Sequence, residues 1–222
     1  MRMSEKTIVV IPAYNEASTI GGVVSKSHKY ADEILVVDDG STDKTTKVAS
    51  KNGAAVVKHK ENRGYSMSLE DGFERAYKKG ASIIITLDAD GQHSPKCIKN
   101  LTKSLKKSNA SVVVGARPQT ARFSESLYGL VSYILTGISD PLSGFKLYTT
   151  EVYEKVGHFD SCRSIGTELL FRAHANGYEV KQSYVSLSKR ENFSQFGVGI
   201  EANIEILTAM VRTLVSVYLR KQ

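Results

Sequence analysis

Two aspartates separated by a single residue follow a run of apolar residues. Asp88 and Asp90 come directly after residues 82–87, and Gln92 adds a neutral oxygen two residues further on. In an extended chain, alternate residues point to the same side, so the two carboxylates repel each other unless a cation lies between them. Hard oxygen ligands favour Mg²⁺ or Mn²⁺ over zinc. An Asp-x-Asp pair by itself is equally typical of a solvated turn, so its neighbours in the fold decide its meaning.

Two more polar loops follow apolar runs earlier in the chain. Residues 11–16 read IPAYNE, in which Pro12 fixes the backbone, Tyr14 offers a stacking face and Glu16 offers an acceptor for a ribose or a base. Asp38 and Asp39 follow the second run, and one of these two carboxylates could accept the N–H of a nucleobase. Each loop alone is typical of an ordinary connection from a strand to a helix.

The elements that must position these loops alternate along the first half. We expect strands at residues 7–11, 33–37, 54–58, 82–87 and 111–116, and helices at 17–30, 43–52, 65–79 and from Pro95. This alternation predicts an α/β fold, a mostly parallel, Rossmann-like sheet flanked by helices. Ligands of such sheets bind beyond the carboxyl ends of the strands, where the polar loops lie.

The alternation breaks after Arg117. Residues 117–142 look irregular, and the stretch 126–139 carries no charge. We expect a strand at 145–148, a helix at 167–176, a strand at 180–187 and a long C-terminal helix at 200–219. The chain is therefore predicted to form one domain, 1–222, with a nucleotide-binding half (1–117), an acceptor half (118–199) and a C-terminal helix (200–222).

Composition excludes several classes of protein. With 222 residues, 41% of them apolar and 24% charged, the chain is typical of a soluble globular protein and not of a collagen, a disordered chain or a disulfide scaffold. Cys97 and Cys162 have no metal or disulfide spacing, which favours a reduced, cytoplasmic protein. The net charge of the chain is +7. The segment from Lys96 to Arg122 has seven basic residues and no acidic ones, so its own charge is as large as that of the whole chain. Such a local excess of positive charge indicates an anionic partner.

The three loops, in this order and at these spacings, resemble the family 2 glycosyltransferases, which have the GT-A fold. The matching segments are IPAYNE at 11–16, VDDGSTD at 37–43, ENRG at 61–64, LDADGQHSP at 87–95 and VVVGAR at 112–117, followed by DPLSGFKLY at 140–148 and KRENFSQFG at 189–197. The DADGQH form is similar to the dolichol-phosphate mannosyltransferase branch.

The resemblance implies roles for individual residues. The nucleotide sugar would be bound by Pro12, Tyr14, Glu16, Val37, Asp39, Asp88, Ala89 and Arg117, the metal by Asp88, Asp90 and Gln92, and the acceptor by Ser143, Gly144 and Ser194. Arg190 matches an arginine that clamps phosphates, a task that suits a guanidinium fork. The last motif departs from the branch, with Phe193 in place of a glycine and Gln195 in place of a lysine.

The reaction that the resemblance implies is inverting transfer of a hexose from GDP-mannose or a UDP-sugar. Asp90 and Arg190 are the expected catalytic residues, and a polyprenyl or dolichyl phosphate is the expected acceptor. A phosphate acceptor is already anionic and needs no strong base. A sugar hydroxyl, the alternative acceptor, needs one, and Glu168 is the candidate, although an acid at the start of a helix is also favourable with its dipole.

A membrane contact is also open from the sequence. Five lysines between residues 96 and 107 fall on one helical face, which is typical of a solvated surface but also suits anionic lipids. The uncharged residues 128–138 are too few to span a bilayer but could lie at its surface. We expect helix 200–219 to pack on the fold or on a second copy of the chain, so a homodimer and a peripheral position on the cytoplasmic face of the membrane both stay open.

Three competing readings have distinct signatures. A sugar-1-phosphate nucleotidyltransferase usually begins with a glycine-rich signature, which IPAYNE replaces here. A nucleic-acid-binding module would interleave aromatic residues with its basic ones, and none do, so no nucleic acid partner is expected. The third reading is a catalytically silent nucleotide-binding relative, against which the presence of Asp88, Asp90 and Arg190 argues.

Overall fold

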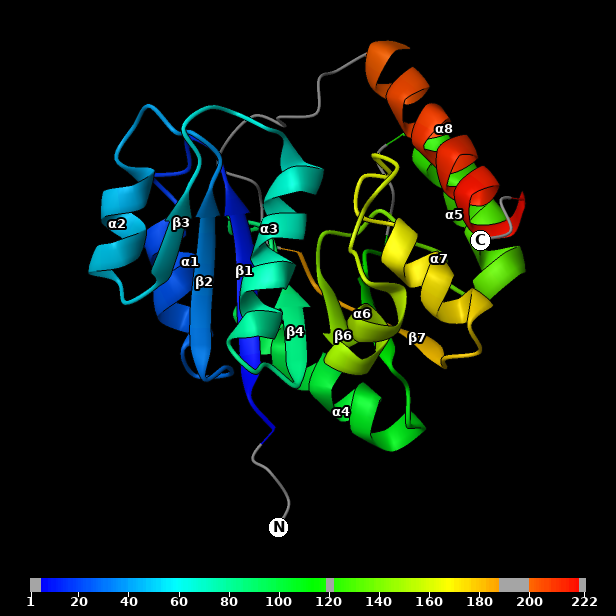
Figure 1. Ribbon diagram of the computed structural model, residues 1–222, viewed down its shortest axis with the longest axis horizontal. Helices are drawn as coiled ribbons and strands as arrows, with labels where there is room; N and C mark the ends of the chain where they lie inside the picture. Colours follow the sequence, from blue (N-terminus) through cyan, green and yellow to red (C-terminus); the bar gives the residue numbers. More distant parts are fainter. Residues whose placement is uncertain (1–4, 119–121, 188–199, 220–222) are drawn as a thin grey trace.

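A seven-stranded sheet forms the centre of the protein. The computed structural model describes residues 5–118, 122–187 and 200–219. The strands are Thr7–Ala13 (β1), Glu33–Asp38 (β2), Ala55–Lys58 (β3), Ile83–Thr86 (β4), Val112–Ala116 (β5), Lys146–Thr149 (β6) and Val180–Tyr184 (β7). They lie in the order β3-β2-β1-β4-β6-β5-β7, and only β6 runs antiparallel to its neighbours (Figure 1). The predicted mostly parallel sheet is confirmed.

Helices cover both faces of this sheet. They are Ile20–Ser27 (α1), Thr45–Lys51 (α2), Tyr65–Lys78 (α3), Ile98–Ser108 (α4), Phe123–Thr136 (α5), Thr150–Val156 (α6), Glu168–Ala175 (α7) and Ile200–Leu214 (α8), with a 3₁₀ turn at Pro95–Cys97 and a π turn at Val215–Leu219. Successive residues of β1 point to opposite faces of the sheet. Val9 belongs to the core cluster that includes residues of α1, α2 and α4, whereas Val10 belongs to the cluster that includes residues of α3, α6 and α7.

The strands of the first half agree with the sequence to within a few residues, with one instructive difference at Pro12. The predicted strand ends at Ile11, but β1 continues to Ala13 and pairs with β2 from Ile8 to Ala13. The neighbouring strand β4 pairs with β1 only as far as Val10. No hydrogen bond from Pro12 to β4 is therefore needed, and Pro12 has no N–H to donate one.

The expectation that residues 117–142 are irregular is wrong, because they contain the helix α5. Its outer face carries Phe123, Leu130, Tyr133 and Ile134, which are 57 to 79% exposed, whereas its buried residues include Ser124, Glu125 and Ser132. A helix with apolar residues outside and polar residues inside has no ordinary amphipathic signal. That inversion is the reason why the sequence pattern did not reveal it.

Helix α8 packs beside α5 at the end of the sheet farthest from β3 (Figure 1). Its Asn203 accepts a hydrogen bond from the Ser124 hydroxyl at 2.6 Å, and Ile206 packs with Tyr128 and Phe171. Within the described ranges, Ile200–Leu219 is also the one helix long and apolar enough to cross a membrane, with a mean hydropathy of 1.3. The hydrogen bond and the shared core agree with the predicted packing of this helix on the fold.

Candidate active site

The loops after β1 and β2 are held together by hydrogen bonds to side chains. The backbone N–H of Asn15 donates to the Ser41 hydroxyl at 2.9 Å, and the N–H of Thr42 donates to the Asn15 side chain at 2.9 Å. The N–H of Glu16 donates to the Thr45 hydroxyl at 2.8 Å. Asn15 has φ of 55°, a left-handed conformation that asparagine tolerates better than most residues. The IPAYNE and DDGSTD segments therefore form one continuous surface.

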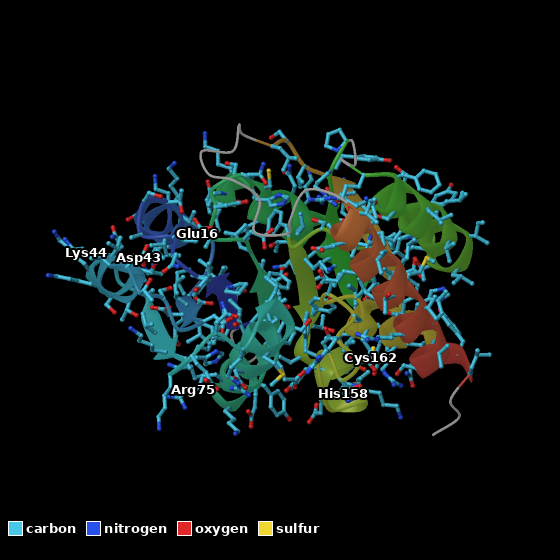
Figure 2. The ribbon with its side chains drawn as sticks, turned by 90° about the horizontal axis from the view of Figure 1, so that it is seen from above. Glu16, Asp43, Lys44, Arg75, His158 and Cys162 are labelled. Carbon is cyan, nitrogen blue, oxygen red and sulfur yellow. The ribbon has the colours of Figure 1, made fainter. Side chains whose placement is uncertain are left out.

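Four of the predicted nucleotide-binding residues lie on or beside this surface. Pro12 and Val37 are partners in the register of β1 and β2, and both are buried. Tyr14 is half-buried, and Glu16, 6% exposed, accepts a hydrogen bond from the Thr19 hydroxyl at 2.9 Å. In the view from above, Glu16 and Asp43 lie near each other over α1 and α2 (Figure 2). The structure brings these residues together, and their contact with a nucleotide stays a prediction.

Asp39 connects this surface to a third loop. Its buried carboxylate accepts hydrogen bonds from His59 Nδ1 at 2.7 Å and from the backbone N–H groups of Arg63 and Gly64, both at 2.8 Å. The segment ENRG at 61–64 is thereby fixed against the end of β2. The predicted contact of Asp39 with a nucleobase would use lone pairs that these three donors leave available.

Asp88 and Asp90 lie just beyond the end of β4, at the same edge of the sheet. Asp88 is half-buried and accepts a hydrogen bond from the Tyr65 hydroxyl at 3.2 Å. Asp90 is 9% exposed, and its Oδ1 accepts the backbone N–H of Gln92 at 3.0 Å, which closes a tight turn at Gly91, directly after the buried Ala89. Burial raises the pKa of Tyr65, and the charge of Asp88 raises it further, so this phenol remains a donor.

This donor set suits a hard divalent cation. Two carboxylates in one turn offer oxygen ligands, which Mg²⁺ and Mn²⁺ prefer, and Gln92 could add an amide oxygen. His93 is 4% exposed, its Nδ1 has no hydrogen-bond partner among the described residues, and its ring lies 5.4 Å from that of Phe145. Burial lowers the pKa of His93, although the charges of Asp88 and Asp90 act in the opposite direction. Asp88, Asp90 and Gln92 remain the predicted metal ligands.

Arg117, at the end of β5, forms an ion pair that the sequence did not reveal. Its Nε and its terminal nitrogen donate to the two oxygens of Asp140, both at 2.8 Å, and the terminal nitrogen also lies 3.3 Å from Glu125. Burial lowers the pKa of Arg117, but the hydrogen bonds and charge of Asp140 outweigh it and hold that pKa above its ordinary value. The predicted phosphate contact of Arg117 would use a guanidinium whose charge Asp140 already balances.

Lys146 is a buried cation at the start of β6. It is 3% exposed and donates a hydrogen bond to the carbonyl oxygen of Gly166 at 3.0 Å. Burial lowers its pKa to about 8, although the charges of Asp140 and Asp88 raise it. Sequence reasoning missed this residue. The only signal was a lysine within an otherwise apolar strand, and buried lysines are rare.

Ser143 and Gly144, predicted to contact the acceptor, both make close internal contacts. The Ser143 hydroxyl is buried and donates to the Gly115 carbonyl oxygen at 2.7 Å, so it holds the loop before β6 against β5. The carbonyl of Gly144 accepts the Thr86 hydroxyl at 2.7 Å. Their acceptor contacts remain predictions, but the hydroxyl of Ser143 is already committed to the backbone. Arg190 and Ser194 lie outside the described residues.

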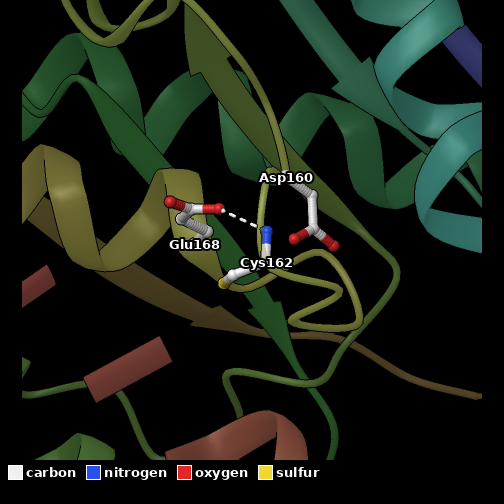
Figure 3. Close-up of side chains that lie close together, drawn as sticks. All are labelled: Asp160, Cys162 and Glu168. Atoms are coloured by element: carbon white, nitrogen blue, oxygen red, sulfur yellow. Dashed lines mark hydrogen bonds between the residues drawn. The ribbon is translucent and has the colours of Figure 1, made fainter. Parts of the chain in front are cut away.

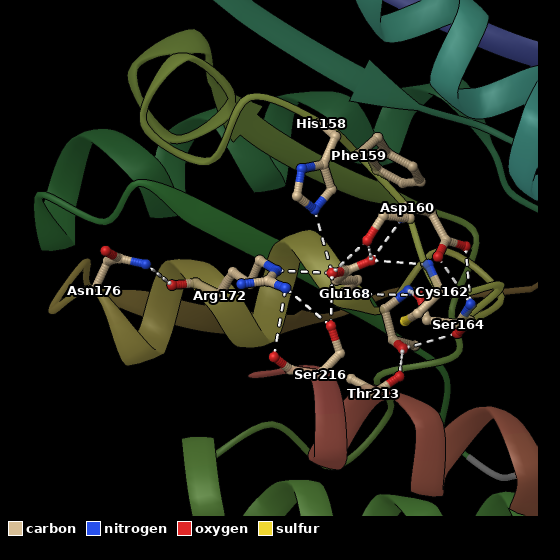
Figure 4. Close-up of polar contacts among 12 residues, drawn as sticks. His158, Phe159, Asp160, Cys162, Ser164, Glu168, Arg172, Asn176, Thr213 and Ser216 are labelled. Atoms are coloured by element: carbon tan, nitrogen blue, oxygen red, sulfur yellow. Dashed lines mark hydrogen bonds and ion pairs between the residues drawn. The ribbon is translucent and has the colours of Figure 1, made fainter. Parts of the chain in front are cut away.

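Glu168 is the centre of a polar network in the second half of the fold. Its fully buried carboxylate accepts hydrogen bonds from Arg172 Nε at 2.7 Å, His158 Nε2 at 3.2 Å and the backbone N–H of Ser161 at 2.6 Å (Figure 4). Burial raises the pKa of Glu168, but the hydrogen bonds from His158 and Arg172 outweigh it and hold that pKa well below its ordinary value. A carboxylate so well supplied with donors is a poor proton acceptor, so the geometry disfavours the predicted role of general base.

The same region contains a group of potential metal ligands. Asp160, Cys162 and Glu168 each have a ligand atom within 4.8 Å of the others (Figure 3). However, the Asp160 carboxylate already accepts the backbone N–H groups of Ser164 and Gly166, and Glu168 is paired with Arg172. Viewed from above, Cys162 and His158 also lie across the molecule from Glu16 (Figure 2). This cluster is therefore structural and distinct from the predicted metal site.

Comparisons with known proteins agree with this geometry. The model of Glycosyl transferase family 2 matches residues 8–159. A UDP-N-acetylglucosamine–dolichyl-phosphate N-acetylglucosaminyltransferase of Methanococcus voltae is 31% identical over 66% of this chain and 71% of its own length. A polyprenol monophosphomannose synthase of Mycolicibacterium smegmatis is 29% identical over 86% of this chain and 80% of its own length.

Solved structures show the same fold at lower identity. Glucosyl-3-phosphoglycerate synthase of Mycobacterium tuberculosis, in complex with Mn²⁺ and UDP-glucose, superposes with a TM-score of 0.76. The two sequences are 21% identical, and the match covers 95% of this chain and 79% of that one. The family match spans the interlocked loops, the two aspartates and β6. The chain belongs to glycosyltransferase family 2, in its dolichol-phosphate mannosyltransferase branch, and is a hexosyltransferase with the GT-A fold.

Proposed function

We propose that this enzyme transfers a hexose, with inversion and with a divalent metal, from a nucleoside-diphosphate sugar to a polyprenyl or dolichyl phosphate. The observation that carries the proposal is the meeting of three interlocked loops with Asp88 and Asp90 at one edge of the sheet. A bound Mg²⁺ or Mn²⁺ would supply positive charge to the leaving diphosphate. The chain's own contribution is a fixed surface for the nucleotide and a preorganised pair of carboxylates.

The donor remains either GDP-mannose or a UDP-sugar. Asp39 could accept the N–H of uracil or of guanine, so its carboxylate does not choose between the two bases. The names of the relatives support both: one uses UDP-N-acetylglucosamine and another makes polyprenol monophosphomannose. The structural neighbour that binds Mn²⁺ binds UDP-glucose.

The acceptor that the site favours is a phosphate. Its oxygen is anionic near pH 7 and attacks without a general base. A sugar hydroxyl, the alternative, needs a base. Glu168, the base suggested by the sequence, accepts hydrogen bonds from Arg172 and His158 and has a lowered pKa. Because that carboxylate is engaged, the phosphate acceptor is the better supported of the two.

A panel of nucleotides tests the donor and the metal together. We expect UDP or GDP to raise the melting temperature of the protein when Mn²⁺ or Mg²⁺ is present, and to raise it much less after chelation with EDTA, because Asp88 and Asp90 would hold the metal and its charge would favour binding of the diphosphate. Turnover of the stabilising nucleotide sugar with polyprenyl phosphate should follow. If nucleotides raised the melting temperature in a metal-dependent way but no sugar were transferred to any phosphate or hydroxyl acceptor, the protein would be a catalytically silent nucleotide-binding relative. If oligonucleotides raised the melting temperature instead, it would be a nucleic-acid-binding protein.

The outer face of α5 supports a peripheral position on the cytoplasmic face of the membrane, where a lipid phosphate would be found. This face consists of Phe123, Leu130, Tyr133 and Ile134 and carries no charge. Water is a poor solvent for such a face, whereas the boundary of lipid headgroups and acyl chains suits it. The lysines of α4 are exposed over a buried face of Ile98, Leu101 and Leu105, as expected for a solvated helix surface.

Vesicle binding distinguishes the two surfaces. We expect Leu130→Glu/Ile134→Glu to weaken co-sedimentation with phosphatidylglycerol vesicles by about a hundredfold, since each apolar side chain withdrawn from water contributes about 1.5 kcal/mol or more. The matched control is Lys99→Glu/Lys103→Glu, which adds the same acids on α4 and should have a smaller effect that high salt removes. If the α4 variant lost more vesicle binding than the α5 variant, the lysines of α4 would be the membrane contact instead. If the wild type formed a salt-insensitive dimer that the α5 variant could not form, the outer face of α5 would be a contact with a second copy of the chain.

A further inference from the structure

The carboxylate of Asp88 is in contact with residues of two other segments. Tyr65, the first residue of α3, donates its hydroxyl to Asp88 Oδ1 at 3.2 Å. Gly144, in the loop that precedes β6, also approaches this carboxylate closely. A Cβ built on Gly144 would lie 2.3 Å from each of the two carboxylate oxygens of Asp88. That separation is far below any real contact, so the carboxylate occupies the space that every other residue would need.

The loop that contains Gly144 has no freedom to retreat. The Gly144 carbonyl accepts the Thr86 hydroxyl at 2.7 Å, and the same hydroxyl accepts the backbone N–H of Lys146 at 3.1 Å. One residue earlier, Ser143 donates to Gly115 at 2.7 Å. Gly144 does not have a positive φ, so its backbone conformation does not require glycine. The requirement for glycine is therefore steric, and an added methyl group would displace Asp88 and leave the loop in place.

We propose that Tyr65 and Gly144 are positioning residues that fix the orientation of Asp88 for metal binding. This inference rests on the proposed function and assigns Gly144 a different role from the acceptor contact that the resemblance implies. Groups that orient metal-ligating carboxylates affect affinity strongly, because a ligand that rotates freely must be ordered when the metal binds. The hydroxyl supplies orientation through a charge-assisted hydrogen bond, and the glycine supplies room.

Two conservative variants test the two contacts. Tyr65→Phe removes only the hydroxyl, and Gly144→Ala adds only a methyl group. We measure the dissociation constant of Mn²⁺ from the electron paramagnetic resonance signal of the free ion, with saturating UDP or GDP, which reports binding without turnover. The expected result is 10- to 100-fold weaker Mn²⁺ binding in each variant.

The chain offers a matched control for each change. Tyr148→Phe also removes a buried hydroxyl, but one that has no hydrogen-bond partner in the described part of the chain. Gly22→Ala also adds a methyl group, but in α1, where nothing lies within 4 Å of it. Both controls should bind Mn²⁺ as the wild type does. If Gly144→Ala fails to fold, Tyr65→Phe alone decides.

The outcomes separate this inference from the proposed function. Wild-type Mn²⁺ affinity in Tyr65→Phe and Gly144→Ala, together with lost binding in Asp90→Ala, would overturn the positioning role and leave the metal site intact. Wild-type affinity in Asp90→Ala as well would remove the metal site from this edge of the sheet, and the inference with it.

Discussion

Replacing Asp90 by alanine is expected to lower kcat with the nucleotide sugar by about a thousandfold while the fold persists. Asp90 lies in the turn after β4, where Gln92 holds one of its oxygens in place. Without this carboxylate the diphosphate loses the charge that a metal supplies, a loss of about 4 kcal/mol of transition-state stabilisation. The measurement is steady-state turnover across a Mn²⁺ titration, with circular dichroism as the check on folding.

An aspartate at the opposite edge of the sheet is the control. The carboxylate of Asp32 accepts the backbone N–H of Thr7 at 2.7 Å, at the start of β1. Asp32→Ala should therefore lower stability slightly and leave the metal dependence of turnover unchanged. Wild-type rates in Asp90→Ala would remove the metal assignment.

Replacing Glu168 by alanine is expected to lower the free energy of unfolding by about 3–5 kcal/mol, the cost of leaving a buried charge without its partner. Glu168 is not exposed at all, and Arg172, whose side chain is 13% exposed, would keep its charge but lose its carboxylate. The Ser161 N–H and the Ser216 hydroxyl would also lose their acceptor. Urea unfolding followed by circular dichroism gives the difference directly.

Glu74→Ala is the matched control, because Glu74 pairs with Lys78 on the exposed surface of α3 and should leave the free energy of unfolding almost unchanged. If Glu168→Ala were as mild, the network would not be structural. The kcat of the folded fraction of Glu168→Gln gives a second test. A near-normal kcat is expected if the network is structural, whereas a large loss of kcat in a fully folded variant would support Glu168 as the general base.

The same network predicts how stability depends on pH. The pKa of Glu168 is lower in the folded protein than its ordinary value of 4.5. The stabilisation is therefore complete above about pH 4.5 and is lost progressively as the pH falls below it. Urea unfolding between pH 3 and 7 should show a steeper acid loss in the wild type than in Glu168→Gln, which has no carboxyl group to protonate at this position. Equal slopes would contradict the lowered pKa.

Much of the first half could be predicted from the sequence, because it follows simple patterns. Short runs of β-branched residues such as 7–11 and 82–87 are typical of buried strands, and in a parallel sheet the polar loops after them meet at the carboxyl edge. This reasoning places Asp39, Asp88 and Asp90 correctly relative to the sheet. The contacts that fix them, such as that of Tyr65 with Asp88 across 23 residues, leave no periodic trace in the sequence.

The second half could be predicted less well, because α5 exposes apolar residues and buries polar ones, and because several carboxylates of this half are buried in polar networks. Glu125 is buried in α5 and pairs with Arg122, three residues away, and with Arg117, eight residues away. Glu168 opens a helix, as expected, and its pairing with Arg172 follows the i,i+4 spacing of a helix. His158 and Ser216 reach Glu168 from other segments, and no spacing rule indicates those two contacts.

The reversed direction of β6 has a consequence for how this enzyme tolerates change. β5 and β6 are neighbours that run antiparallel, so the chain leaves the sheet and returns to it on the same rim. The segment between them, which includes α5, can therefore be lengthened, shortened or exchanged without threading past another strand. Chimeras that swap residues 123–139 between relatives would test whether this segment, in the predicted acceptor half, selects the acceptor.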